Sequence, residues 1–143
     1  MEHCPFCMSD PADHLLANDL AFALPDRYPV TPMHTLIIPK RHTESCFTLT
    51  IDEVIACRAL ILELQQLIQR RDRTVSAFNI GINIGRDAGQ TISHCHIHLI
   101  PRRTGDVENP RGGVRHVIAA KGSYPGTELP DHDNPSPTEG SSI

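Results

Sequence analysis

The clearest pattern in the chain is an alternation of histidine with apolar residues. Residues 93–103 read S-H-C-H-I-H-L-I-P-R-R. Successive side chains of a strand point to opposite faces, so the histidines are expected on one face and the apolar residues between them on the other. The three histidines are His94, His96 and His98. The pattern predicts a strand with one packed face and one face that carries three titratable groups.

Three further segments predict strands. Residues 18–24 and residues 34–39 are apolar, and the second is dense enough to indicate a central strand. Residues 76–84 alternate, and the glycine-bearing segment 85–91 turns them back into the histidine strand. Two strands joined in this way predict an antiparallel hairpin, whose loop suits anions because its backbone N–H groups can converge.

One long helix is predicted from Thr50 to Arg71. Thr50 and Glu53 form a capping box, in which each side chain binds the backbone N–H of the other residue. The expected apolar stripe consists of Val54, Ile55, Leu60, Ile61, Leu64, Leu67 and Ile68. We expect this stripe to lie on the sheet or to meet a second subunit.

Length and charge limit the possible functions. The 143 residues suit one domain with a modest core. Residues 1–121 balance 13 basic against 13 acidic residues, so nucleic-acid binding is not expected. No apolar run approaches the ~20 residues of a membrane span, and no secretory signal is recognisable, which predicts a cytoplasmic location. The polar, proline-rich residues 122–143 predict a disordered tail.

Residues 102–115 carry four arginines and three glycines. Arginine forks suit phosphate groups, although a solvated loop also explains any single one of these arginines.

Five cysteines in a chain without an export signal argue against a disulfide framework. Cys4 and Cys7 form a Cys-x-x-Cys motif, which supplies half of a zinc site. Two incidental thiols explain the motif equally well, and a redox pair is less favoured because no βαβ unit follows.

Two kinds of chemistry suit three alternating histidines beside a glycine loop. Neutral imidazoles on one face can share a metal ion. A neutral imidazole can also attack phosphorus, provided that one ring nitrogen is held protonated while the other attacks. His34 at the head of the 34–39 strand and His42 just past its end are placed to face such a site, although a solvated or locally hydrogen-bonded histidine explains either one alone better.

The H-C-H-I-H-L-I segment matches the defining pattern of the histidine triad (HIT) superfamily. The resemblance extends to L-P-D-R-Y-P-V, H-T-L-I-I-P-K-R-H and N-I-G-R-D-A-G-Q-T, in the family's order, and covers roughly residues 3 to 120. The G-Q-T, I-P-R and P-R-G-G-V-R segments are similar to the Fhit-like, dinucleoside-polyphosphate-hydrolase branch. The resemblance implies an α+β fold, a mainly antiparallel sheet with the long helix packed on it, in a homodimer of HIT domains (residues 1–121).

The resemblance also implies a division of roles. His96 would attack the α-phosphate of an adenosine nucleotide, such as a diadenosine polyphosphate, and water would cleave the nucleotidyl-histidine to release AMP. His98 would contact the phosphate and assist the leaving group, and His34 would orient the triad. Nucleotide contacts are implied for Asp26, which would bind the ribose, and for Asn83, Gly89, Gln90, Thr91 and His98, which would hold phosphate oxygens.

Some HIT proteins hold a structural zinc through two N-terminal cysteines and two histidines. The matching residues here are Cys4, Cys7, His42 and His94, a closed Cys₂His₂ set. Iron or an empty site remain alternatives, and no organic cofactor is implied.

Two departures from the family pattern affect expectations. Met33 replaces a frequent glycine, which predicts a tighter approach to the site, and Asn83 is shorter than the glutamine of some relatives, which affects polyphosphate-length preference. Two other functions stay open: nucleotidyl transfer to phosphate, and nucleotide binding with residual catalysis.

Overall fold

The computed structural model describes residues 3–124. These residues belong to two compact units, of which the first ends at Glu108 and the second begins at Asn109. The domain limits expected from the sequence, with a boundary at residue 121, stay a prediction. Residues 125–143, which make up most of the predicted tail, lie outside the described part of the chain.

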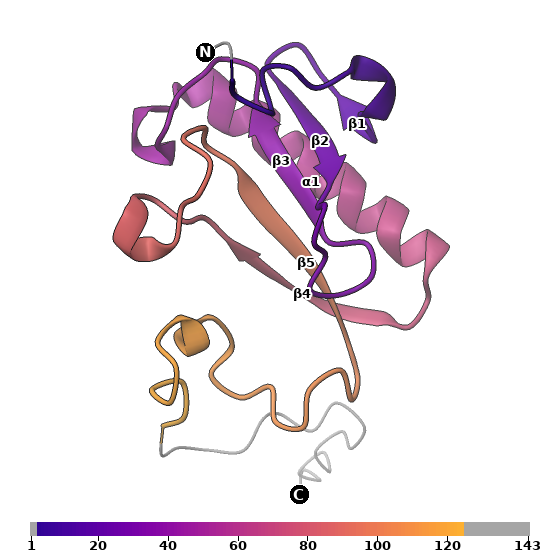
Figure 1. Cartoon of the computed structure of the whole chain (residues 1–143). Coiled ribbons are helices and arrows are strands. Elements are labelled where there is room, and N and C mark those ends of the chain that lie inside the picture. The colour runs from indigo at the N-terminus through magenta and orange to yellow at the C-terminus, as the bar shows by residue number, and fades with distance from the viewer. Residues whose placement is uncertain (1–2, 125–143) are drawn as a thin grey trace, which may run out of the picture. The chain divides into compact units, whose positions relative to one another are not determined.

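The first unit contains one antiparallel sheet of five strands in the order β1-β2-β3-β5-β4 (Figure 1). The strands are β1 (Leu16–Ala17), β2 (Ala21–Pro25), β3 (Thr35–Pro39), β4 (Val75–Gly81) and β5 (Ile97–Arg103). This sheet, with one helix packed on it, confirms the expected α+β fold. The central position of β3 and the pairing of β4 with β5 agree with the sequence prediction.

The histidine strand begins later than the sequence predicts. β5 starts at Ile97, so two of the three histidines precede it. The N–H of His94 donates to the carbonyl of Ile92, and the N–H of Cys95 donates to the carbonyl of Thr43. These bonds fold the segment before β5 into a turn that is tied to the chain after β3.

Helix α1 (Ile51–Arg71) has the predicted limits. Thr50 Oγ1 accepts a hydrogen bond from the N–H of Glu53 at 3.2 Å, and Glu53 Oε2 accepts from the N–H of Thr50 at 2.8 Å, which confirms the capping box. Arg70 and Arg71 lie in the last turn, where the helix dipole favours cations. Among the helices of residues 3–124, none combines the length and apolar character needed to cross a bilayer.

The apolar stripe of α1 differs from the prediction at its first turns. The buried residues are Glu53, Cys57, Leu60, Leu64 and Ile68, which recur at spacings of three and four. Val54 and Ile55 were expected in this stripe but are exposed. They lie one and two positions after Glu53, which turns them well away from the sheet on a helix of 3.6 residues per turn.

The sheet separates two apolar clusters. On one face, residues of α1 pack on Ala23, Ile37 and Leu99. On the other face, Phe6 from the N-terminal segment packs with Phe22, Leu36 and Ile38. In Figure 1 the helix covers one side of the sheet only. His98 pairs with Leu36 across β5 and β3, so the histidine side chain lies on the face of the sheet away from α1.

Short 3₁₀ helices complete the described structure: Pro11–Asp13, Cys46–Thr48, Arg86–Ala88 and, in the second unit, Gly113–Val117.

An ion pair connects α1 to the chain after β3. The guanidinium of Arg41 donates to both carboxylate oxygens of Glu53, at 2.7 and 2.8 Å. This fork and the capping bonds hold the pKa of Glu53 down to about 2. The segment that carries His42 is thereby fixed to the start of the helix.

We predict that Glu53→Gln lowers the free energy of unfolding by about 1–2 kcal/mol at pH 7, because Arg41 is half-exposed and water screens the pair. A carboxyl with a lowered pKa stabilises the fold above its unfolded pKa and loses this effect as the pH falls toward 2. The difference between wild type and variant, measured by urea unfolding, should therefore narrow below pH 5. Glu63→Gln, on the exposed side of the same helix, is the control, and equal effects of both substitutions would contradict the assignment.

Candidate active site and metal centre

Three separate segments bring four metal-ligating side chains together. Cys4 and Cys7 come from the N-terminal segment, His42 follows β3, and His94 precedes β5. One ligand atom of each residue lies within 4.8 Å of the others. The structure thus assembles all four residues that the sequence suggests for a metal site.

The distances within this group fit a tetrahedral ion. Cys7 Sγ lies 3.2 Å from His42 Nδ1, and Cys4 Sγ and Cys7 Sγ each lie 3.5 Å from His94 Nδ1. Zinc bound to sulfur at about 2.3 Å and to nitrogen at about 2.0 Å places its ligands roughly 3.6 Å apart. The four side chains can therefore hold a zinc-sized cation with little rearrangement.

His94 is prepared to act as a ligand. Its Nε2 lies 2.8 Å from the carbonyl oxygen of Pro39, and a carbonyl can only accept, so Nε2 carries the hydrogen. The lone pair of Nδ1 then faces the two thiols. Burial lowers the pKa of His94, and the neighbouring His42 and His96 lower it further, which favours the neutral ring that metals require.

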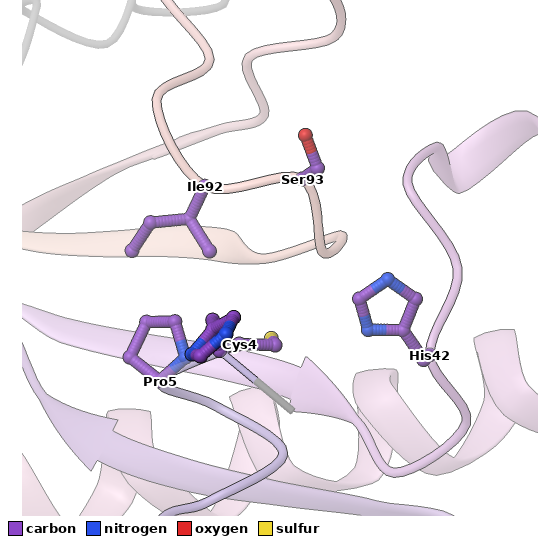
Figure 2. Close-up of a pocket in the computed structure, with 6 residues that line it drawn as sticks. Cys4, Pro5, His42, Ile92 and Ser93 are labelled. Atoms are coloured by element: carbon purple, nitrogen blue, oxygen red, sulfur yellow. The ribbon is translucent and has the colours of Figure 1, made fainter. Parts of the chain in front are cut away.

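A cavity of about 290 Å³ borders the metal group, lined by His3, Cys4, Pro5, His42, Ile92 and Ser93. Figure 2 shows Ile92 and Ser93 on the segment before β5. The Ile92 side chain is directed toward Pro5 and Cys4 of the N-terminal segment, the Ser93 side chain is directed away from them, and His42 lies to one side. Neither His96 nor His98 lines this cavity. The cavity therefore borders the group of four candidate metal ligands and not His96 or His98.

The backbone determines which nitrogen of His96 is reactive. Its Nδ1 lies 2.8 Å from the carbonyl oxygen of His94 and must carry the hydrogen, because the carbonyl only accepts. The lone pair of the neutral ring is consequently on Nε2. This is the state that a nucleophilic imidazole needs.

A chain of hydrogen bonds places the hydrogen of His98 on Nε2, whereas the hydrogen of His96 is on Nδ1. The N–H of Val30 donates to His34 Nδ1 at 3.2 Å, so a neutral His34 carries its hydrogen on Nε2. His34 Nε2 lies 3.0 Å from His98 Nδ1 and donates to it. His98 therefore carries its own hydrogen on Nε2, a buried atom with no partner among the described residues.

Asp26 lies beside this chain. Its Oδ2 is 3.5 Å from His34 Nε2 and 3.9 Å from His98 Nδ1. Burial lowers the pKa of both His34 and His98, and the Asp26 charge opposes this only in part, so both rings are neutral near pH 7. The candidate ligand atoms of Asp26, His34 and His98 also lie within 4.8 Å of one another. The hydrogen bond between His34 and His98 already accounts for this spacing. The contact of Asp26 with ribose stays a prediction.

The glycine loop is held by its own hydrogen bonds. The side chain of Gln90 accepts from the N–H of Gly85 at 2.8 Å and donates to the carbonyls of Glu44 and Ile92. The backbone N–H groups of Gly89 and Gln90 donate within the loop. Gln90 thus shapes the loop, and the phosphate contacts expected of Gly89, Gln90, Asn83 and Thr91 stay predictions.

Met33 adopts a backbone conformation that side chains rarely accept. Its φ is 70°, in the left-handed region, directly before His34. The side chain packs against the helix-side core. The expectation that it narrows the approach to the site therefore finds no support in its packing.

Phe6 is a part of the site that the sequence predictions do not include. This buried ring, inside the Cys-x-x-Cys motif, lies edge-on to His94 and His96, with centroids 5.7 and 5.2 Å apart. It packs against both imidazoles from one side. One of only four phenylalanines, placed between two candidate ligands, was the available signal.

Comparison with known families agrees with this geometry. The HIT domain matches residues 9–105, which is more than half of the chain. The chain belongs to the HIT family. The Fhit-like resemblance seen in the sequence is confirmed by its relatives.

Two relatives and one solved structure illustrate the similarity. The bis(5'-nucleosyl)-tetraphosphatase [asymmetrical] of Schizosaccharomyces pombe is 39% identical over 87 residues, 61% of this chain and 47% of that protein. The bifunctional bis(5'-adenosyl)-triphosphatase/adenylylsulfatase FHIT of Arabidopsis thaliana is 34% identical over 101 residues, 69% of this chain and 54% of that protein. This HIT protein thus spans about half the length of both relatives. A Zn-bound histidine triad family protein from Mycobacterium smegmatis has a TM-score of 0.66 at 31% identity, covering 73% of this chain and 78% of that chain.

Proposed function

We propose that this HIT protein hydrolyses adenosine nucleotides, such as diadenosine polyphosphates or AMP conjugates, at the α-phosphate and releases AMP. The observation that carries the proposal is the 2.8 Å hydrogen bond from His96 Nδ1 to the His94 carbonyl, which leaves the Nε2 lone pair for attack. Both relatives described above are named as hydrolases of such dinucleotides.

The reaction proceeds in two balanced steps. His96 Nε2 forms a bond to the α-phosphorus, and the bond from this phosphorus to the leaving oxygen breaks. The Nε2–H of His98 donates a hydrogen bond to the departing oxygen, which leaves as a phosphate anion with the electron pair of the broken bond. Water then attacks the nucleotidyl-histidine, loses a proton to the solvent, and releases AMP as the bond to His96 Nε2 breaks and leaves a neutral His96.

His34 positions His98 in this scheme. The bond from its Nε2 to His98 Nδ1 keeps the His98 hydrogen on Nε2, where it can donate a hydrogen bond to the leaving oxygen. The carboxylate of Asp26 lies near both rings and opposes the loss of their protons, in addition to its proposed contact with ribose. Asn83, Gly89, Gln90 and Thr91 are proposed to surround the phosphate oxygens after substrate binding.

Nucleotidyl transfer to phosphate is the second candidate, and nucleotide binding with residual catalysis is the third. The same intermediate would yield ADP if inorganic phosphate, instead of water, resolved it. The hydrogen positions described above for the histidine rings favour an enzyme over a binding protein, because binding alone does not require a free lone pair on His96 Nε2.

We predict that His96→Asn lowers AMP release from diadenosine tri- or tetraphosphate by at least roughly 1,000-fold, because the nucleophile is lost. Chromatography of products with and without added phosphate measures both outcomes. Activity that survives in the variant would exclude His96 as the nucleophile, whereas phosphate-dependent ADP would favour transfer. The variant must retain the thermal midpoint of the wild type.

We propose that Cys4, Cys7, His42 and His94 hold a structural zinc. The support is the spacing of the ligand atoms and the hydrogen bond from His94 to Pro39. Bound zinc supplies a fixed crosslink between the N-terminal segment and the chain before β5, and the reaction itself does not pass through it.

Elemental analysis of protein purified without chelators should find about one zinc per chain. Cys7→Ser should reduce this content and lower the thermal midpoint, because a thiolate ligand is lost. Cys46→Ser, which changes a half-buried cysteine outside the group, is the matched control. Less than about half an equivalent in the wild type would count against the site.

We also propose a homodimer. β4 lies at the edge of the sheet, and Ile51, Ile55 and Leu62 form an exposed apolar stripe on α1. Sedimentation equilibrium should give twice the chain mass of 15.8 kDa, and Ile55→Glu should shift the protein toward the monomer by placing a charge in the interface. Gln65→Glu, elsewhere on the helix, is the control, and a monomeric wild type at micromolar concentration would refute the proposal.

A further inference from the structure

The arginine-rich segment of the sequence divides into two pairs with different partners. Arg102 donates to both carboxylate oxygens of Asp106 at 2.8 Å, and Arg103 donates to Asp72 at 2.8 and 3.0 Å. Both guanidiniums are neutralised by carboxylates of the first unit. They account for half of the positive charge that the sequence concentrates here.

Arg111 and Arg115, in the second unit, lack such partners. Neither forms an ion pair with a carboxylate of residues 3–124. Instead their guanidinium carbons lie 5.1 and 4.7 Å from the ring centroid of Tyr124, within the range of cation–π attraction. Nη2 of Arg111 is buried and has no hydrogen-bond partner within the described part of the chain.

Hydrogen bonds and a close backbone approach hold the chain around Arg111 and Arg115 in a tight turn. His116 Nε2 donates to the carbonyl of Arg111 at 2.8 Å, and Arg115 Nε donates to the carbonyl of Gly122 at 3.1 Å. Gly112 has a φ of 92°, and a Cβ there would lie 2.5 Å from the Gly122 carbonyl oxygen. This turn requires glycine, and it fixes the two arginines relative to each other.

The charges of the second unit are separated along the chain. Residues 109–124 contain two arginines and Lys121 but no aspartate or glutamate, whereas residues 125–143 contain two aspartates and two glutamates. Two guanidiniums held over one ring repel each other, and an anion between them removes this repulsion. Guanidinium forks match phosphate oxygens, which accept several hydrogen bonds at once. A chain of phosphates carries enough charge to engage both arginines.

We propose that Arg111 and Arg115, supported by Tyr124, form a binding site for a chain of two or more phosphates. The chemistry is shared by free inorganic polyphosphate and by the phosphate chain of a nucleotide. The site does not depend on the proposed hydrolysis, because it lies in residues that the mechanism does not use.

Calorimetric titration of inorganic tripolyphosphate into the full chain carrying His96→Asn tests the site. Arg111→Gln and Arg115→Gln should each weaken binding about tenfold, and Arg111→Lys should recover part of the loss by restoring charge without the fork. Arg102→Gln is the matched control, since it removes the same charge from an arginine already paired with Asp106. Circular dichroism establishes that each variant is folded.

Absence of tripolyphosphate binding to the parent chain, or equal weakening by Arg102→Gln, would overturn the proposal. Displacement of tripolyphosphate by diadenosine tetraphosphate, with the same dependence on Arg111 and Arg115, would identify the nucleotide as the source of the phosphate chain. Arginine-dependent binding of tripolyphosphate without displacement would identify free polyphosphate. Neither result depends on AMP release, so the site and the proposed hydrolysis are tested separately.

Discussion

Two backbone carbonyls fix the chemical state of the histidine row. The Pro39 carbonyl holds the hydrogen of His94 on Nε2, and the His94 carbonyl holds the hydrogen of His96 on Nδ1. Carbonyls do not change their role with pH, so these states persist wherever the rings are neutral. His94 therefore has its lone pair on Nδ1, whereas His96 has its lone pair on Nε2. His94 contributes to both bonds, through its ring in one and its backbone in the other.

The sheet leaves room for the histidine row because α1 packs on one of its two faces and the histidines lie on the other. α1 and Ile37, Ile97 and Leu99 form the core on that side. The other face carries Phe6, His96 and His98, of which Phe6 and His96 are buried. Burial lowers the pKa of His34 and His98, which favours their neutral rings.

Features carried by side-chain identity could be predicted from the sequence, and features carried by backbone groups could not. The Thr50 and Glu53 capping box gave both the start and the character of α1, and the resemblance to the HIT superfamily anticipated the assembly of Cys4, Cys7, His42 and His94. The Pro39 carbonyl and the Val30 N–H have no residue signature, since every non-proline residue has both groups and proline retains the carbonyl.

Tertiary contacts also overrode local patterns. Val54 and Ile55 satisfy helical periodicity but face away from the sheet, because the rotation of the helix is set by the stripe from Cys57 to Ile68. The four arginines of residues 102–115 look equivalent in sequence. Only the fold shows that Asp72 and Asp106 pair with the first two.

Met33 has a left-handed backbone conformation, its side chain packs in the helix-side core, and His34 directly follows it. For a residue with a Cβ this conformation costs about 1–2 kcal/mol, while the half-buried thioether contributes contacts to the helix-side core. Substitutions at position 33 therefore change two opposing quantities at once, conformational strain and packing. A glycine at position 33 would relieve the strain and remove the packing together, directly beside His34.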